Sequence, residues 1–167
     1  MAMVSVSAEA WKAFAQAKMP RFYWDFGKAK KYLEKSENPW TPVVSVVFAF
    51  NVALDMILKE GLQNVFARHA RIGKMMRDGL KAMGLPLFVE EKYASNTVTA
   101  ATIPAGLDGK KFRQLLRDEY DITITGGQET LDGKILRIGH MGFVTEKEIK
   151  ELLAAMTDED PTLSFRE

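Results

Sequence analysis

The sequence contains no cysteine and only two histidines, His69 and His140. Without cysteine the chain has no disulfide, no thiolate metal site, no iron–sulfur cluster and no cysteine nucleophile. Two histidines are too few for a histidine-rich metal site. We therefore expect no metal centre in this chain.

The chain also lacks an excess of charge and a long uninterrupted apolar run. Lys and Arg total 23 and Asp and Glu total 22, so the formal charge of +1 gives no long-range attraction to nucleic acid or to an anionic membrane. The most apolar stretch, residues 43–50, is soon followed by Asp55 and Lys59, so no membrane span is expected. Glu9 and Lys12 occupy the place where a signal peptide needs an apolar core. The expected compartment is the cytoplasm.

Helical patterns fill the first half of the chain. Residues 4–7 alternate like a very short strand, and helical spacing then follows over residues 8–18, 42–60 and 64–83. Residues 27–35 are expected to form a short basic helix or a turn. The stretch at residues 64–83 carries an apolar stripe of Val65, Ile72, Met76, Leu80 and Met83. Gly84 predicts the end of this helix, because glycine readily adopts the left-handed conformation that follows a helix.

Strand patterns dominate the second half. Strands are expected over residues 87–91, 97–103, 122–125 and 134–138. Asp108 is a suitable cap for a helix after the second strand, and Thr145 with Glu148 forms a capping-box pattern before a last helix. The order β-β-α-β-β-α after the long helices predicts an α+β fold with an open, mainly antiparallel sheet covered by helices.

The pair Thr41-Pro42 is the first candidate for binding chemistry. Thr41 is typical of a helix N-cap and Pro42 of the first helical position. A helix N-terminus presents unpaired N–H groups and a partial positive charge, and residues 42–45 contain no Asp or Glu. An anion could therefore bind there. The same pattern also describes an ordinary helix cap.

Arg137 is the second candidate. Strand alternation places it on the same face as Ile135 and Gly139, between the apolar residues Leu136 and Ile138. An arginine in an apolar strand is costly to bury unless it is paired, and its planar fork suits bidentate binding of a carboxylate. A structural ion pair or a solvent contact on an edge strand would explain it equally well.

Gly126 and Gly127 stand at the end of an expected strand, where glycine allows the backbone to approach a ligand closely. Plain tight turns explain them as well, and the pair is too short to be a nucleotide-binding fingerprint. His140 could contact a ligand, but a lone histidine at a strand end is more often hydrogen-bonded to backbone. The aromatic residues within 22–26 are more typical of a core or an interface than of a stacking platform.

Together these segments resemble the class V aminotransferases, the group that includes alanine–glyoxylate and serine–pyruvate aminotransferases. The similarity covers residues 4–156, and the stretch around Arg137 is its most specific part. The residues that carry the match, in order and spacing, are Thr41-Pro42-Val43-Val44-Ser45, Glu60-Gly61-Leu62, Ala67-Arg68-His69, Gly126-Gly127-Gln128 and Leu136-Arg137-Ile138-Gly139-His140-Met141-Gly142.

The resemblance implies fold type I, in which a large cofactor domain is followed by a small C-terminal domain. It implies pyridoxal phosphate as cofactor and a homodimer as the assembly. The reaction would transfer an amino group between a small amino acid, of alanine or serine type, and a 2-keto acid such as glyoxylate or pyruvate. Arg137 matches the arginine that holds the substrate carboxylate. Thr41 matches a residue that reaches the cofactor phosphate across the dimer interface.

The lysine that binds the cofactor covalently has no match in this sequence, nor has the cofactor domain before it. We therefore expect a C-terminal fragment with no catalytic residue of its own, inactive alone. Its expected parts are a remnant strand of the large domain at residues 1–7, a helical connecting region at 8–84, an α+β domain at 85–157 and a frayed tail at 158–167.

Two other interpretations stay open. One is a non-catalytic α+β module that uses Arg137 to bind a small carboxylate. The other comes from names, because some relatives of this family are called small subunits of a soluble hydrogenase. Metal or cluster chemistry in this chain is hard to support physically, since cysteine is absent and histidine is scarce.

Overall fold

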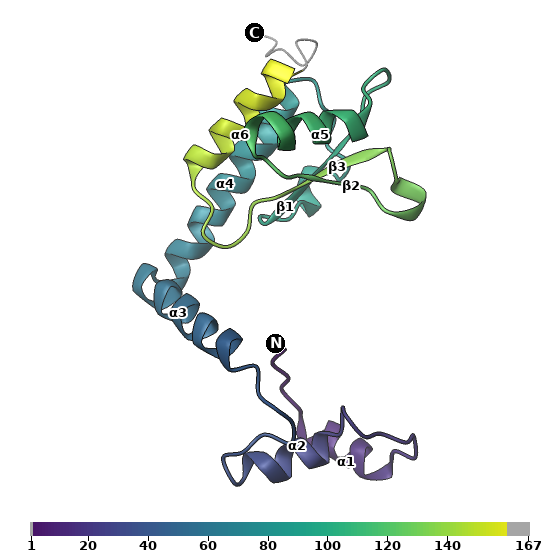
Figure 1. Ribbon diagram of the computed structural model, residues 1–167, viewed down its shortest axis with the longest axis vertical. Coiled ribbons are helices and arrows are strands. Elements are labelled where there is room, and N and C mark those ends of the chain that lie inside the picture. The colour runs from purple at the N-terminus through teal and green to yellow at the C-terminus, as the bar shows by residue number, and fades with distance from the viewer. Residues whose placement is uncertain (1, 160–167) are drawn as a thin grey trace. The chain divides into compact units, whose positions relative to one another are not determined.

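The computed structural model describes residues 2–159, which divide into two compact units between Lys59 and Glu60. Figure 1 labels their helices and strands. The sequence led us to expect a boundary near residues 84–85. The division lies earlier because the helix that precedes Gly84 packs on the sheet and helices that follow it, and so belongs to the second unit.

The first unit contains α1 (Ala8–Gln16), α2 (Phe26–Leu33) and nearly all of α3 (Val44–Glu60). Ser7 caps α1 by accepting a hydrogen bond from the Ala10 N–H, and Asp25 caps α2 through two N–H groups of its first turn. Residues 4–7 are not in a strand, contrary to expectation. A strand needs a neighbour to hydrogen-bond with, and no strand lies among the described residues of this unit.

Helix α3 is apolar on most of its circumference, yet none of its residues is buried. Phe48 is 71% exposed and Leu58 is 76% exposed. A helix that is apolar all round normally lies inside a larger protein or a membrane. No helix within residues 2–159 has the length and apolarity needed to cross a membrane. The exposed face of α3 is therefore a surface that another protein segment could cover.

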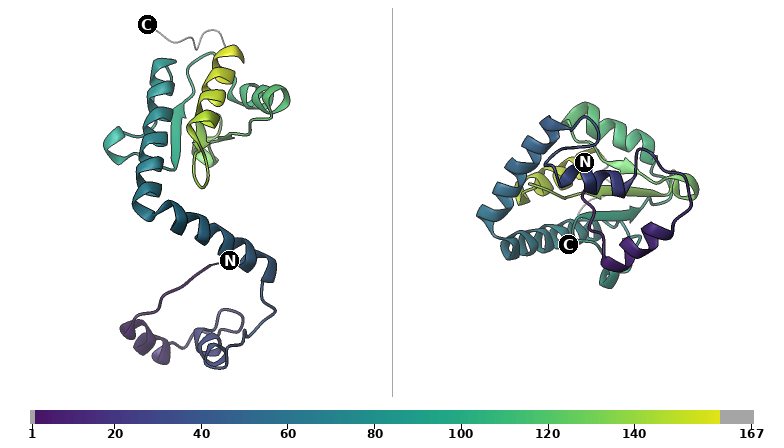
Figure 2. Two further views of the ribbon diagram at one scale, coloured as in Figure 1. Left: turned by 90° about the vertical axis from the view of Figure 1, so that its left-hand side faces the viewer. Right: turned by 90° about the horizontal axis from the view of Figure 1, so that it is seen from below.

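The second unit is an α+β structure, as predicted. Its elements are α4 (Leu62–Ala82), β1 (Val98–Thr102), α5 (Gly109–Tyr120), β2 (Thr125–Gly126), β3 (Ile135–Gly139) and α6 (Glu146–Glu159), with 3-10 turns at Glu91–Tyr93 and Glu129–Leu131. The three strands are antiparallel in the order β1-β3-β2, so β3 is the central strand. Figures 1 and 2 show α4, α5 and α6 grouped beside this sheet.

The core of the second unit lies between one face of the sheet and the three helices. Leu136 and Ile138 of β3 and Ala101 of β1 point into it. Helices α4, α5 and α6 contribute residues at helical spacing: Ile72, Met76, Leu80, Phe112, Leu116, Ile149, Leu152, Leu153 and Met156. The apolar stripe predicted for residues 65–83 is thus confirmed from Ile72 to Met83, whereas Val65, at its start, is only half-buried.

The predicted end of α4 is confirmed in detail. Gly84 has a φ of 80°, the Leu85 N–H donates to the Leu80 carbonyl at 2.9 Å, and the Gly84 N–H donates to the Lys81 carbonyl at 3.0 Å. This is the Schellman pattern, in which a left-handed residue satisfies the last carbonyls of a helix. Leu85 is fully buried and anchors the turn.

Two predicted strands are shorter than expected. Residues 87–91 pair with β1 only at Leu87, and the chain then turns into the 3-10 segment Glu91–Tyr93. The strand predicted at 122–125 is reduced to Thr125–Gly126. Asp121 ends α5 in the left-handed conformation, with a φ of 55°, and the residues directly after it connect the helix to the sheet. Helix α6 extends to Glu159, beyond the expected start of the tail at residue 158, and residues 160–167 lie outside the described part of the chain.

Candidate functional site

Arg137 lies in the middle of β3, opposite Ala100 of β1 and Thr125 of β2. Its neighbours Leu136 and Ile138 are buried in the core, so alternation places Arg137 on the sheet face that the helices do not cover. This confirms the face predicted from the sequence. The residue is half-buried there.

Within residues 2–159 the guanidinium of Arg137 forms one hydrogen bond, in which Nε donates to the Gly126 carbonyl at 2.7 Å. Among residues 2–159, no carboxylate forms an ion pair with it. β3 is also flanked by a strand on each side, so Arg137 is not on an edge strand. Neither ordinary explanation, an ion pair or an edge-strand solvent contact, applies within the described chain. The other N–H groups of the fork remain able to bind an anion.

The structure joins Gly126 to Arg137 through that hydrogen bond, and it shows why residue 127 is glycine. A Cβ built on Gly127 would lie 1.9 Å from the Leu131 carbonyl oxygen. Gly127 therefore allows the backbone at Leu131 to approach closely, which is a contact within the protein and not with a ligand. Backbone contact of these glycines with a ligand stays a prediction.

Thr41 is not the N-cap of α3, contrary to expectation. The helix begins at Val44, and its first bond runs from the Val47 N–H to the Val43 carbonyl, so Val43 occupies the cap position. The Val44 N–H turns back to the Pro42 carbonyl, which delays the helix by two residues. Thr41 is exposed and belongs to the first unit, whereas Arg137 and Gly126 belong to the second.

The start of α3 nevertheless retains the chemistry expected of an anion site. Its first turn contains no acidic residue. The N–H groups of Ser45 and Val46 donate to no acceptor within residues 2–159, and the hydroxyl of Thr41 is likewise unbonded there. Free N–H groups at a helix start favour an anion electrostatically.

His140 is a structural residue. It is fully buried, its Nε2 lies 2.8 Å from the Thr99 hydroxyl, and its Nδ1 lies 3.1 Å from the Asn96 carbonyl oxygen. Burial lowers the pKa of His140 below its ordinary value of 6.5. The imidazole therefore holds the end of β3 against residues 96–99 and is not available to a ligand.

Arg68 fixes the loop that follows β3, a role the local sequence did not reveal. Its Nε and Nη2 bind the two carboxylate oxygens of Glu60 at 2.6 and 2.9 Å, and its Nη1 donates to the carbonyls of Gly142 and Val144 at 3.0 and 3.1 Å. The hydrogen bond from Arg68 lowers the pKa of the Glu60 carboxyl. Because the loop residues lie more than 70 positions from Arg68, no local pattern could have shown the contact.

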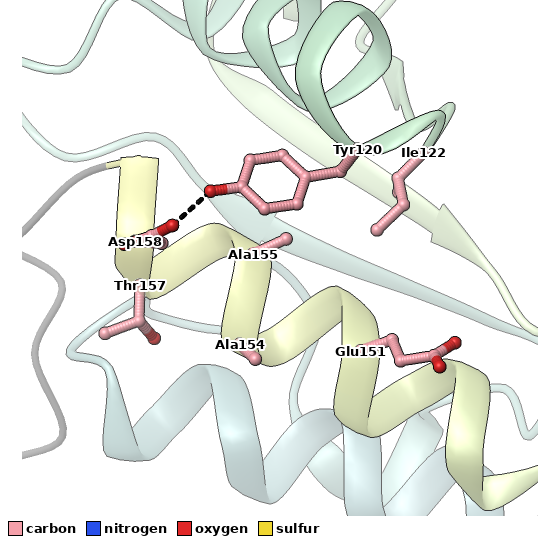
Figure 3. A pocket seen from close by; sticks show the side chains of 7 residues that line it. All are labelled: Tyr120, Ile122, Glu151, Ala154, Ala155, Thr157 and Asp158. Atoms are coloured by element: carbon pink, nitrogen blue, oxygen red, sulfur yellow. Dashed lines mark hydrogen bonds between the residues drawn. The ribbon is translucent and has the colours of Figure 1, made fainter.

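Two other features of the second unit are less suitable for binding a carboxylate. Tyr120, Glu151 and Asp158 line a hollow between α5 and α6, where the Tyr120 hydroxyl donates to Asp158 (Figure 3). Its two carboxylates would repel an anionic ligand. Arg77 lines a cavity of about 180 Å³, but its Nε lies 3.5 Å from the carboxylate of Glu91, so its charge is already compensated.

Comparison with known proteins identifies relatives of this chain, although no family model matches it. An uncharacterized aminotransferase of Methanocaldococcus jannaschii is 45% identical over 158 residues, which are 93% of this chain and 41% of that protein. A serine–glyoxylate aminotransferase of Arabidopsis thaliana is 33% identical over 93% of this chain and 39% of its own length. The crystal structure of an alanine–glyoxylate aminotransferase from Nostoc sp. matches with a TM-score of 0.85 and 31% identity, over 92% of this chain and 42% of that chain.

The chain belongs to the class V aminotransferases. It spans about 40% of the length of the curated relatives it matches, a share consistent with the C-terminal part of an aminotransferase. A further relative, 40% identical over 156 residues, is named the 42 kDa subunit of a soluble hydrogenase in Anabaena cylindrica. In the described residues of this aminotransferase chain, no three His, Cys, Asp or Glu side chains are grouped so that they could hold a metal ion.

The burial of His140 predicts how the stability of this aminotransferase chain depends on pH. Because the folded pKa is lowered, the unfolded chain binds the proton more readily, so stability is complete above pH 6.5 and falls as the pH drops below it. The free energy of unfolding, measured by urea titration between pH 8 and 5.5, should show this fall. His140→Gln should lack it, whereas His69→Gln, which keeps His140, should retain it. An identical pH dependence for the parent chain and His140→Gln would contradict the assignment.

Proposed function

We propose that this chain is the substrate-carboxylate-binding part of a pyridoxal-phosphate-dependent aminotransferase. The parent enzyme would transfer an amino group between a small amino acid, of alanine or serine type, and a 2-keto acid such as glyoxylate or pyruvate. The observation that carries the proposal is the Arg137 guanidinium, which is half-buried on a central strand and has no carboxylate partner within the described chain. The names of the relatives support the reaction class.

Arg137 would bind both oxygens of the substrate carboxylate and thereby set the orientation of the carbon next to it. A planar fork is suited to this task because two parallel N–H···O bonds fix direction as well as distance. The Gly126 carbonyl, by accepting from Nε, limits the rotation of the fork. Partial burial strengthens the attraction, because less water competes for the two charges.

The residues at the start of α3 fit the phosphate of the cofactor. Thr41 would donate its hydroxyl, and the N–H groups of Ser45 and Val46 would donate along the helix axis. No acidic side chain in the first turn opposes a phosphate. When bound, pyridoxal phosphate supplies the electron-withdrawing ring that amino-group transfer requires. By the resemblance described above, this end of α3 would serve the cofactor of a second subunit in a homodimer.

Covalent attachment of the cofactor would fall to a lysine outside this chain. Every lysine within residues 2–159 is exposed except Lys28, which is half-buried with its ammonium 4.0 Å from the ring centre of Trp40. An amine that attacks a carbonyl must be uncharged, a condition that burial favours and free exposure to water does not. We therefore propose that the chain alone is catalytically inactive.

In the parent protein another segment would cover the exposed apolar face of α3. That segment would belong to the region that the relatives have and this chain does not span, or to the second subunit. Phe48, Val52 and Leu58 would contribute most to that contact, being large and mostly exposed.

A non-catalytic module that binds a small carboxylate is the second candidate. It is favoured by one observation, that this chain itself holds Arg137 through the Gly126 carbonyl while no lysine within residues 2–159 is buried. Binding of pyridoxal phosphate by the chain together with the rest of the protein would separate the two functions.

Substitution of Arg137 tests the proposed role most simply. In the enzyme that contains this chain and the rest of the protein, Arg137→Ala should reduce kcat/KM for the amino acid by about 2–5 kcal/mol of transition-state binding, the range for removing one partner of a buried charge pair. Cofactor binding should change little. Arg117→Ala, which removes an exposed arginine of α5, is the matched control. A kcat/KM within a few-fold of the parent value would make Arg137 structural.

Reduction with borohydride tests the proposed absence of a cofactor lysine. The pure 167-residue chain, mixed with pyridoxal phosphate and reduced, should give no stoichiometric adduct on one specific lysine when its mass and peptides are analysed. A full-length serine–glyoxylate aminotransferase treated in parallel is the positive control. One uniformly modified lysine in the chain would refute this part of the proposal.

Substitution of Thr41 tests the phosphate site. In the enzyme, Thr41→Val keeps the branched shape and removes one hydrogen bond to a charged group, so cofactor affinity should fall about ten- to a hundredfold. In a hybrid dimer, Thr41→Val in one subunit is combined with loss of the cofactor lysine in the other. The remaining lysine-bearing site then receives an intact Thr41 from its partner and should bind cofactor nearly normally. Weak binding at that site would place Thr41 within its own subunit, and unchanged affinity in the Thr41→Val homodimer would remove it from the cofactor site.

A further inference from the structure

Gly127 is packed so closely that no side chain fits there. A Cβ at this position would lie 1.9 Å from the carbonyl oxygen of Leu131 and 2.4 Å from its carbonyl carbon. Both atoms belong to the backbone, so the contact cannot be relieved by rotating a side chain. Either the turn at residues 128–133 or strand β2 has to move.

The turn is tied to the rest of the sheet. The Leu131 carbonyl accepts from the Lys134 N–H at 3.0 Å, and the Lys134 carbonyl accepts from the Ile103 N–H at 2.9 Å, next to the end of β1. A movement of Leu131 would therefore disturb two consecutive backbone hydrogen bonds. The turn is the more firmly held of the two segments.

Strand β2 is held less firmly. It has two residues, and beyond them only the Gly127 N–H continues the pairing, with a bond of 3.2 Å to the Ile135 carbonyl. On the helix side, a Cβ at Gly126 would lie 3.1 Å from the guanidinium carbon of Arg113, which is the end of a flexible side chain. A side chain at position 127 would therefore displace β2.

We infer that Gly127 is a positioning residue for Arg137, acting through the carbonyl of Gly126. The absence of a side chain at 127 lets β2 lie where the Gly126 carbonyl meets Arg137 Nε at 2.7 Å. The Gly126-Gly127 pair then aims the guanidinium and need not touch a ligand. The consequence for substrate binding rests on the function proposed above for Arg137.

Nuclear magnetic resonance of the isotope-labelled 167-residue chain tests the inference directly. The parent chain should show a scalar coupling through the hydrogen bond between Arg137 15Nε and Gly126 13C′, and titration with pyruvate should shift the Arg137 Nε–H signal. Gly127→Ala should abolish the coupling and weaken pyruvate binding roughly tenfold, as expected when a hydrogen bond to a charged group no longer orients the fork. Gly133→Ala is the matched control, because it strains a left-handed residue of the same turn (φ 70°) but places its Cβ in open space. It should keep both the coupling and the affinity.

A second substitution keeps the test informative if Gly127→Ala alone prevents folding. Glu129 has a φ of 49°, which glycine adopts without strain, so Glu129→Gly should offset part of the lost stability. The double variant should fold and still lack the coupling. Absence of the coupling in the parent chain, or its persistence in a folded variant with alanine at 127, would overturn the inference. If the coupling behaves as described but pyruvate shifts no Arg137 signal in the parent chain, the positioning role stands and the proposed carboxylate binding fails.

Discussion

The hydrogen bond between Arg137 Nε and the Gly126 carbonyl determines how the candidate site is built. It holds a positive charge half-buried on the central strand without supplying a negative partner, an arrangement that a protein rarely keeps for stability alone. The surrounding structure maintains it. Leu136 and Ile138 anchor β3 in the core on either side, and the turn that fits against Gly127 keeps β2 in register.

The loop after β3 is fixed separately, by two residues for which we propose no contact with a ligand. His140 is buried against residues 96–99, and Arg68 binds the carbonyls of Gly142 and Val144 together with the Glu60 carboxylate. The segment in which the resemblance to class V aminotransferases is most specific is thus largely a framework. Arg137 is half-buried within it and is the residue that we propose binds a ligand, and the residues around it secure its position.

Local patterns in the sequence were sufficient for much of the second unit. The apolar stripe of α4, its end at Gly84 and the face of β3 that carries Arg137 all follow from spacing or from one residue's conformational preference, and all are confirmed. Segments whose structure depends on distant partners were less predictable. Residues 4–7 have the alternating pattern of a strand but no strand in their unit to pair with. Helix α3 begins at Val44, and not at the predicted Pro42, because the Val44 N–H bonds to the Pro42 carbonyl in a turn. The Arg68 side chain binds a distant backbone carbonyl, and Gly127 packs against the backbone of Leu131. Neither contact leaves a periodic pattern in the sequence.

The central claim, that Arg137 binds a substrate carboxylate, is tested most directly by comparing pyruvate with pyruvamide, which has nearly the same shape but no charge. Dissociation constants of both compounds should be measured for the parent chain and for Arg137→Gln. If Arg137 binds the carboxylate, the parent chain should bind pyruvate about ten- to a hundredfold more tightly than pyruvamide, the difference expected for hydrogen bonds between charged groups. The preference should disappear in Arg137→Gln. Equal affinities in the parent chain, or a preference for pyruvate that survives in Arg137→Gln, would contradict this role of Arg137.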